Sequence, residues 1–213
     1  MRKSLNFIHK DNYGEAMKVA KKFTDKGTFR PILQFVLHDK NKSIYATDSH
    51  RAIQIKDIHG FDKDYLVHPN TLEFATGNYP EIDDKINFSG GEKVITLTKE
   101  QIGIWLQMHR SLNQVIRQSY KGREHVSIEF KENIQLKING ENEITINLPY
   151  EEYHRKEDVD VISYNVTYMR DCLEAHAKLG SNHVDLIIKS KMRPIAIDNG
   201  DNVRCLLLPV RIY

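Results

Sequence analysis

One succession of elements occurs twice in the second half of the chain, and it restricts the folds that the sequence can adopt. In each copy a short apolar strand precedes an amphipathic helix, and three alternating strands follow the helix. The first copy is predicted at residues 94–97, 99–118, 126–130, 134–138 and 143–148, and the second at residues 159–163, 166–179, 184–188, 194–197 and 203–208. The repetition predicts one α+β domain with antiparallel sheets on one side and two adjacent helices on the other.

The first 89 residues show the same succession incompletely. A strand is predicted at residues 4–9, a helix at 13–24, and three strands at 32–37, 43–47 and 52–55. A second copy begins with a strand at 65–67 and a helix at 70–75 after Pro69, but its last three strands are missing. Residues 77–84 are typical of a loop, and Gly90-Gly91 marks a boundary. We expect a truncated domain at residues 1–89 and a complete domain at residues 90–213.

The composition is that of a globular protein, because 40% of the residues are hydrophobic and 28% are charged. No apolar run is long enough to span a membrane and residues 1–20 are not signal-like, so a cytoplasmic protein is expected. The two cysteines, Cys172 and Cys205, are interpreted as core residues. The net charge is only +2, so any binding to nucleic acid would depend on local clusters of cations or on topology.

Cations gather on the outward faces of the predicted helices. Along the helix at 99–118 and just beyond it, a polar stripe recurs at intervals of three and four: Gln107, Arg110, Gln114, Arg117 and Lys121. The other two helices carry Lys18, Lys21 and Lys22, and a mixed set of Thr167, Arg170, Glu174 and Lys178. A solvated helix face explains most such stripes. Acidic residues lie largely in loops and strands, however, which favours a functional surface.

The end of the chain has two interpretations. An apolar strand follows the Asn199-Gly200 turn, and Pro209 then removes a hydrogen-bond donor, so the last residues should leave the sheet or lie on its edge. In that case Leu207, Leu208, Val210 and Ile212 lie near the surface beside Arg211 and form part of a groove. The alternative is a final core strand with a frayed end, and local features do not decide between them.

Several short stretches carry a resemblance to a known family. The segments Arg30-Pro31-Ile32-Leu33, Ala46-Thr47-Asp48-Ser49-His50-Arg51-Ala52 and Tyr79-Pro80-Glu81-Ile82 resemble the middle domain of the bacterial DNA sliding clamp, the β subunit of the replicative polymerase. The segments Ser163-Tyr164-Asn165-Val166-Thr167-Tyr168-Met169, Arg193-Pro194-Ile195 and Leu208-Pro209-Val210-Arg211-Ile212 are similar to its last domain and tail. They occur in the family's order and span nearly the whole chain.

The resemblance implies a DNA-clamp fold of repeated βαβββ units and a non-catalytic processivity factor without a cofactor or a metal. Helices would line a hole around duplex DNA, and a DNA polymerase or other replication protein would be the partner. The implied DNA-facing residues are Lys18, Lys21, Lys22, Arg110, Arg117, Lys121, Arg170 and Lys178. Two domains per chain suggest a head-to-tail trimer with six domains around the ring.

The resemblance also implies a groove for short peptides with leucine or phenylalanine anchors. Its first side would be formed by Leu33, Thr47, Ser49, His50, Arg51 and Ala52. Its second side would be formed by Leu206, Leu207, Leu208, Pro209, Val210, Arg211 and Ile212. His50 and Arg51 are expected at the rim, where they could bind peptide carbonyl groups or a carboxylate.

The sequence departs from the family in ways that leave a second function open. The chain begins where a middle domain would begin, and Ser49 and Ala52 stand where a glycine and a larger apolar residue are usual. The strands missing after residue 75 belong to a domain edge, through which clamp subunits pair. The alternative is therefore a clamp-like binding module that forms no ring and acts as an adaptor, decoy or regulator of replication proteins.

An enzyme is not expected. Asp48, Ser49 and His50 contain the residue types of a catalytic triad, but neighbours along a strand point to opposite faces. The ten histidines show no metal-binding spacing, and no GxxxxGK loop is present to hold a nucleotide. Glu81, Asp83 and Asp84 form an acidic cluster that is interpreted as a solvated loop.

Overall fold

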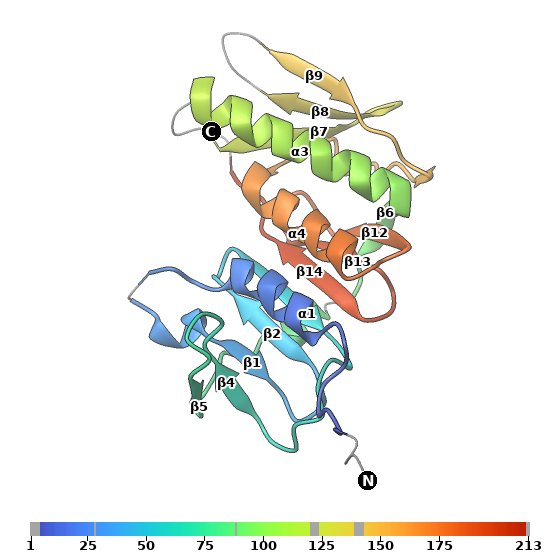
Figure 1. Ribbon diagram of the computed structural model, residues 1–213. Coiled ribbons are helices and arrows are strands. Elements are labelled where there is room, and N and C mark those ends of the chain that lie inside the picture. Colours follow the sequence, from blue (N-terminus) through green and yellow to red (C-terminus); the bar gives the residue numbers. More distant parts are fainter. Residues whose placement is uncertain (1–4, 28, 88, 120–123, 139–142, 212–213) are drawn as a thin grey trace.

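A computed structural model describes residues 5–27, 29–87, 89–119, 124–138 and 143–211 (Figure 1). The second half of the chain contains both predicted repeats. The first repeat consists of β6 (Glu92–Thr98), α3 (Lys99–Ser119), β7 (His125–Phe130), β8 (Ile134–Ile138) and β9 (Ile144–Asn147). After the short β10 (Glu152–Tyr153), the second consists of β11 (Val161–Asn165), α4 (Val166–Lys178), β12 (His183–Ile188), β13 (Ile195–Asp198) and β14 (Val203–Leu207). The predicted α+β class is confirmed.

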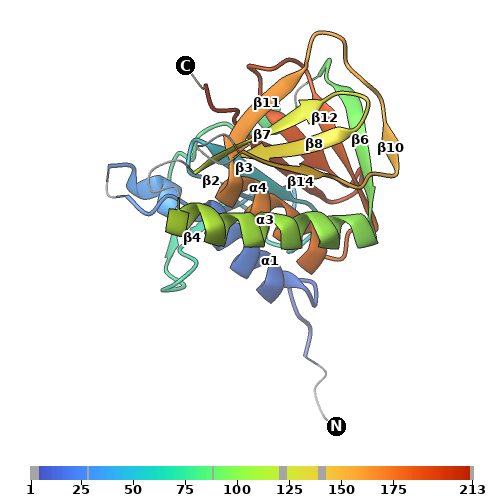
Figure 2. The ribbon, with the colours of Figure 1, turned by 90° about the horizontal axis from the view of Figure 1, so that it is seen from above.

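The first strand of each repeat belongs to the sheet formed by the other repeat. β6 pairs with β12, and β11 pairs with β7, so neither sheet is built from one repeat alone. The resulting sheets have the orders β10-β6-β12-β13-β14 and β11-β7-β8-β9. α3 and α4 lie side by side and cover them from one side (Figures 1 and 2). The exchange makes the two repeats a single cooperative unit.

The helices of this half begin at capped positions and enclose a core with paired polar groups. Thr98 and Gln101 form a reciprocal cap at the start of α3, with N···O distances of 3.0 and 3.3 Å. The Asn165 side chain accepts hydrogen bonds from the N–H groups of Thr167 and Tyr168 at the start of α4. Trp105 is fully buried, and its Nε1 donates to the carbonyl oxygen of Pro149 over 2.7 Å.

The first part of the chain has one sheet. It contains α1 (Tyr13–Ala20), the short 3₁₀ helices η1 (Lys21–Phe23) and η2 (Pro31–Gln34), β1 (Val36–His38), β2 (Ile44–Thr47) and β3 (Arg51–Ile55). After them come β4 (Tyr65–Val67), β5 (Phe74–Ala75) and the single-turn helix α2 (Asp83–Ile86). The strands follow the order β3-β2-β1-β4-β5, and α1 lies over this part of the sheet (Figure 1).

Three expectations for this part were wrong. Residues 5–9 form no strand apart from a bridge between His9 and His59, because the described chain holds no second sheet here that could pair with them. Pro31 begins η2, which delays the strand predicted at 32–37 until Val36. Residues 70–75 form a turn and then β5 instead of a helix, because β4 offers a free edge for pairing and so short a helix is not stable alone.

β14 joins the two parts of the chain into one sheet. It pairs antiparallel with β3 from Val203↔Ile55 to Leu207↔Arg51, so the larger sheet contains ten strands from β10 to β5. The division into domains at residues 1–89 and 90–213 stays a prediction, since the hydrogen-bonded sheet crosses it. The junction between β3 and β14 is where the residues singled out for a groove meet.

Candidate functional site

A cavity of about 470 Å³ opens at the junction between β3 and β14. Ala52 and Leu206, which face each other across the two strands, form its floor. Ile32 and Leu33 of η2 line one wall, and α2 with the segment before it closes the other. Most of these side chains are apolar. A concave apolar cavity with a few polar groups at its edge is a typical binding site for a short peptide or a small molecule.

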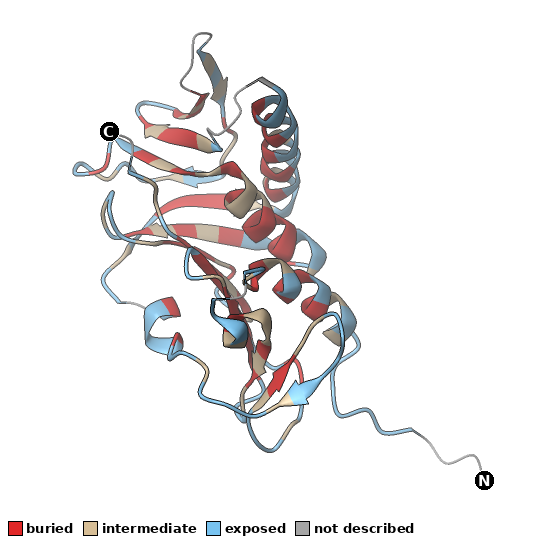
Figure 3. Cartoon of the chain, turned by 90° about the vertical axis from the view of Figure 1, so that its left-hand side faces the viewer, coloured by how far each residue is buried: buried red, intermediate tan, exposed pale blue. Residues whose placement is uncertain are grey.

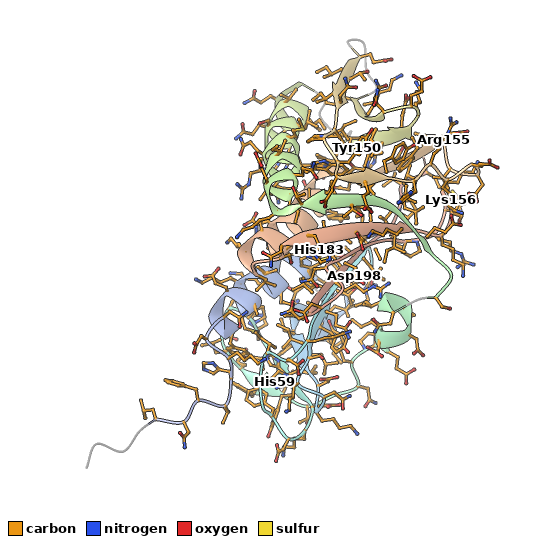
Figure 4. All side chains as sticks on the ribbon, turned by 90° about the vertical axis from the view of Figure 1, so that its right-hand side faces the viewer. His59, Tyr150, Arg155, Lys156, His183 and Asp198 are labelled. Carbon is orange, nitrogen blue, oxygen red and sulfur yellow. The ribbon has the colours of Figure 1, made fainter. Side chains whose placement is uncertain are left out.

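The sheet separates this cavity from the longer helices. Leu206 belongs to a small cluster with Ala52, Ile82 and Ile86 on the cavity side. Leu207 points to the other face and is fully buried in the main core. Figures 3 and 4 show α2 on one side of the sheet and α1, α3 and α4 on the other. The two surfaces singled out in the sequence therefore lie on opposite faces of the same sheet.

The structure brings together most of the residues assigned to the groove. Eight of them line the cavity: Leu33, Thr47, Ser49, His50, Arg51, Ala52, Leu206 and Leu208. Leu207 does not, because side chains alternate along β14, and the expectation for this residue was wrong. Pro209, Val210 and Arg211 lie beyond the lining, and Ile212 is outside the described residues.

The chain leaves the sheet after β14. The N–H group of Leu208 donates to the carbonyl oxygen of His50 over 2.9 Å, and that of Val210 donates to the carbonyl oxygen of Ser163 over 2.7 Å. The segment therefore crosses from β3 to β11, and Leu208, which is 39% exposed, stands at the rim of the cavity. Of the two interpretations of the tail, a core strand describes it only as far as Leu207.

Sequence reasoning missed the wall formed by residues 80–86. Pro80, Ile82, Lys85 and Ile86 all line the cavity, and Ile86 is fully buried. The four-residue spacing of Ile82 and Ile86 places both on one side of α2, against the sheet. The segment Tyr79-Pro80-Glu81-Ile82 contributes to the resemblance, but a helix of four residues is too short to leave a periodic pattern.

A tight turn positions the polar residues at the cavity. Ser49 has a φ of +76°, the left-handed region that favours glycine, which explains why glycine is usual in the resembling proteins. Thr47 holds the turn, because its Oγ1 accepts from the Ser49 N–H group over 3.1 Å and donates to the Arg51 carbonyl oxygen over 2.7 Å. Asp48 Oδ1 accepts from the N–H groups of His50 and Arg51, both over 3.0 Å.

These contacts do not form a catalytic triad. The Asp48 carboxylate is bound by backbone N–H groups and by Arg51, and the Ser49 hydroxyl is bound by the Arg30 guanidinium. The His50 ring stacks near Tyr168, with ring centroids 6.1 Å apart. Within the described ranges, no group of three or more His, Cys, Asp or Glu residues could hold a metal ion, and no helix is both long and apolar enough to cross a bilayer.

Arg51 joins the two parts of the chain and is not free for a peptide. Its guanidinium donates to Asp48 over 3.0 Å, to Asp171 of α4 over 2.6 Å and to the carbonyl oxygen of Lys22. It also lies over the ring of Tyr168, 4.3 Å from the centroid. Only 7% of the side chain is exposed. The expectation that its charged group binds a guest was wrong, because the ion pair with Asp171 already engages it.

The opposite face of the sheet presents α1, α3 and α4 side by side (Figure 2). The basic residues assigned to this face are only partly free. Lys22, Arg110 and Lys178 all contact Glu174, at N···O distances of 2.8, 3.5 and 3.3 Å. Arg170 pairs with Asp171, and Lys18 with Glu15. Acidic residues therefore do lie on these helices, contrary to the sequence interpretation.

The remaining cations of the face keep their charge unpaired within the described ranges. Lys21 and Arg117 are exposed and make no ion pair there, and Lys121 lies outside those ranges. Burial alone would raise the pKa of Glu174, but hydrogen bonds and charges from Lys22 and Lys178 lower it, so it remains ionised. The face thus combines a fixed ion-pair network with a few mobile positive charges.

Comparison with solved structures identifies the arrangement. The DNA polymerase sliding clamp of Bacillus subtilis aligns with a TM-score of 0.78 and 18% sequence identity, over 100% of this chain and 66% of the other. The DNA polymerase III beta chain of Streptococcus pneumoniae aligns with a TM-score of 0.79 and 19% identity, over 100% of this chain and 67% of the other. This chain has the fold of a bacterial DNA sliding clamp. The fold that the resemblance implied is confirmed.

The likeness to the clamps lies in structure more than in sequence. The Helicobacter pylori beta clamp bound to a DNA ligase peptide aligns with a TM-score of 0.70 and 15% identity, over 100% of this chain and 68% of the other. The chain spans about two thirds of the length of these clamps. No protein-family model and no curated protein matches the sequence. Within the clamp fold, the cavity at β3 and β14 lies between two consecutive domain-like parts.

Proposed function

We propose that this chain is a non-catalytic, clamp-like tether that holds a replication protein through the cavity at β3 and β14 and contacts duplex DNA with its helical face. The observation that carries the proposal is the position of the two surfaces on opposite faces of one sheet. A partner bound on one face leaves the other free for DNA. Neither surface requires a reacting group, because a tether works by linkage.

The cavity suits a short peptide with apolar anchors. Leu33, Ala52 and Leu206 provide buried apolar walls, and exposed Arg30, His50 and Lys85 provide polar groups around them. Such an arrangement buries large apolar side chains and fixes their direction by a few hydrogen bonds. The Helicobacter pylori clamp, which was solved with a DNA ligase peptide, supports this kind of partner.

A peptide with a glutamine followed by leucine and phenylalanine tests the cavity. It should bind with a Kd in the micromolar range, or about −8 kcal/mol, measured by fluorescence anisotropy. Leu208→Asp should weaken binding at least tenfold, because it places a charge at the rim, whereas Val115→Asp changes a similarly exposed residue on α3, on the other side of the sheet. Equal affinity of the two variants would remove the site.

The helical face suits loose contact with the DNA backbone. Its unpaired cations can neutralise phosphates without reading bases. Arg110→Glu with Arg117→Glu should weaken DNA binding and reduce the slope of log K against log salt by about 2. Lys189→Glu with Lys191→Glu makes the same change of charge outside the helices and should have a smaller effect.

Whether the chain surrounds DNA is a separate question of topology. A closed ring, such as the proposed trimer, stays on nicked circular DNA and slides off once that DNA is linearised. Light scattering gives the mass of the species that binds. Retention on circular DNA alone would support the ring, and equal loss from both forms would exclude it.

One observation favours the alternative module without a ring. Among the described residues, the first part contributes strands to one sheet and has one α-helix longer than a single turn, whereas the second half contributes strands to two sheets and has two such helices. Its outer edge is β5, a strand of two residues, which offers few hydrogen bonds for pairing between subunits. A monomer at high concentration that still binds the peptide would establish the adaptor, decoy or regulator and reject the ring.

A further inference from the structure

A second cavity, of about 610 Å³, lies on the same face of the sheet as the proposed peptide groove. Pro80 and Ile82 line both cavities, so a single segment of chain separates them. A continuous peptide that extends a few residues beyond its apolar anchors could cross this segment. The second cavity is therefore close enough to contact the same guest.

The two cavities differ in the sign of their charge. The lining of the second contains five carboxylates and one cation: Asp39, Asp64, Glu81, Asp83, Asp84 and Lys56. The lining of the groove contains the exposed cations Arg30 and Lys85, together with His50 and the ion-paired Arg51, and, among the described residues, no carboxylate. The charge reverses across Pro80 and Ile82. A guest that spans both cavities must therefore carry positive charge at the end that enters the second.

The second cavity is also rich in hydrogen-bond acceptors. Asp83 accepts from Tyr45 over 2.8 Å, from Asn87 over 2.9 Å and from Gln54 over 3.2 Å, which fixes its carboxylate. Burial, together with the hydrogen bond to Asp83, raises the pKa of Tyr45, so its hydroxyl remains a donor.

An acceptor on the wall has no partner. Gln54 lines the cavity and is only 3% exposed, and its Oε1 makes no hydrogen bond within the described ranges. Glu81 and Asp84, on the rim, are exposed and form no ion pair there. An unpaired buried acceptor beside carboxylates favours a ligand with several N–H donors, which is the chemistry of a lysine or arginine side chain.

We propose that the second cavity binds a lysine- or arginine-rich flank of the peptide whose apolar anchors enter the groove. The inference rests on the proposed function and narrows its partner to a motif in which basic residues adjoin leucine and phenylalanine. The acidic cluster at residues 81–84, which the sequence indicated to be a solvated loop, then contributes to selection among peptides. Charge complementarity at a rim gives specificity and faster association more than raw affinity, so it would distinguish such peptides from one another.

The test uses the full chain and peptides that share one anchor sequence. One peptide has a neutral glycine-serine flank, two have three lysines at one end or the other, and one has three glutamates. At low salt, one of the lysine peptides should bind about fivefold or more tightly than the neutral peptide, and the gain should fall as salt is raised. The glutamate peptide should bind more weakly than the neutral one.

Two charge-matched variants locate the effect. Glu81→Gln with Asp84→Asn should remove most of the lysine gain and leave the affinity for the neutral peptide unchanged, which also shows that the groove is intact. Glu100→Gln with Asp201→Asn removes the same charge from exposed positions elsewhere and should keep the gain. Failure of the neutral peptide to bind would refute the proposed groove. If the neutral peptide binds normally but the lysine peptides bind no more tightly, only the role of the second cavity is refuted. The same holds if both double variants lose the extra affinity for the lysine peptide equally.

Discussion

The two parts of this chain share one sheet but differ in completeness. In the complete domain, β6 pairs with β12 and β11 pairs with β7, so two sheets and two helices close around one core. In the first part, the pairing of β4 with β1 corresponds to the pairing of β6 with β12. The second sheet is missing from the described residues of this part. The first part thus contains the sheet that joins β14, but its described residues contain no second sheet with which residues 5–9 could pair.

The incomplete part also has the more strained backbone. Four residues other than glycine have positive φ angles, and all lie there: Lys42, Ser49, Asp57 and Leu72, at +69°, +76°, +52° and +59°. In the rest of the chain, as far as it is described, the positive angles belong to glycines, including Gly180 and Gly200. Exposed apolar residues such as Phe7, Phe29 and Phe74 gather in the first part as well. Left-handed residues other than glycine and strongly exposed apolar side chains are thus both characteristic of the first part.

The largest expected effect tests the core of the complete domain. Trp105→Ala should lower the free energy of unfolding by about 4 kcal/mol, because it creates a large cavity and leaves the Pro149 carbonyl unpaired. Phe74→Ala, at a residue that is 59% exposed in the first part, should cost less than about 1 kcal/mol. Urea unfolding followed by circular dichroism measures both, and similar losses would contradict the contrast between a closed and an open core.

The next prediction tests the joint between the parts. Arg51→Met should cost about 3 kcal/mol, because it removes the partner of one carboxylate oxygen of the buried Asp171 and leaves only the contacts of the other oxygen with Arg170 and Lys22 among the described residues. Adding Asp171→Leu should recover part of that loss, since the carboxylate that lost its Arg51 partner disappears, although Arg170 then loses its own partner. If the double variant is no more stable than Arg51→Met alone, the pair does not connect the two parts as described.

Acid should weaken both parts. The pKa of His38, His109 and His176 is lowered to about 4, mainly by burial and, for His38, also by the nearby His59. Their unfolded pKa is near 6.5, so the unfolded state binds protons first as the pH falls. The contribution of each histidine to the free energy of unfolding is fully present above pH 6.5 and is lost as the pH falls toward 4. Between pH 7 and 5 the loss is about 2 kcal/mol per histidine.

Histidine variants assign this loss to the two parts. His38→Gln should remove the contribution of one histidine of the first part to the pH dependence of the ΔG of unfolding. His109→Gln should remove the contribution of one histidine of the second half. The ΔG of unfolding at pH 7 and pH 5 gives each share as a difference, so a general loss of stability cancels. An unchanged difference in both variants would mean that the histidines are protonated in the folded protein.

The sequence predicted the elements of the second half because they are long and periodic. Strand alternation placed the core faces, and Thr98 and Asn165 cap the two helices in the structure. Alternation cannot say which strand is the neighbour, so the exchange of β6 and β11 was not visible. In the first part, residues 4–9 and 70–75 carry local preferences for elements whose partners are missing, and both predictions failed there.

The site was less predictable than the fold. The resemblance supplied the residues around the β2–β3 turn, but strand alternation should have excluded Leu207, which lies between two cavity-lining leucines. The role of Arg51 depends on Asp171, 120 residues further along the chain, and no local pattern reveals such a partner. The carboxylates of the second cavity come from three separate segments, so only folding brings them together.

The smallest expected effect tests the backbone strain with a matched pair. Leu72→Gly should stabilise the protein by up to about 1 kcal/mol, since glycine adopts positive φ without a steric penalty and the Leu72 side chain, 65% exposed, has little packing to lose. Gly200→Ala should cost about 1 kcal/mol, because no atom lies within 4 Å of the added Cβ and only the φ of +72° opposes it.

Both changes alter the flexibility of the unfolded chain in opposite directions, which reduces each effect and makes the sign more informative than the size. In Leu72→Gly, the hydrogen bond from the N–H group of residue 72 to the His68 carbonyl oxygen, 2.9 Å long, does not depend on the side chain and should persist. A destabilised Leu72→Gly together with a destabilised Gly200→Ala would mean that the first part tolerates its left-handed residues without strain. The contrast between the two parts would then rest on packing alone, because the backbone would be equally relaxed in both.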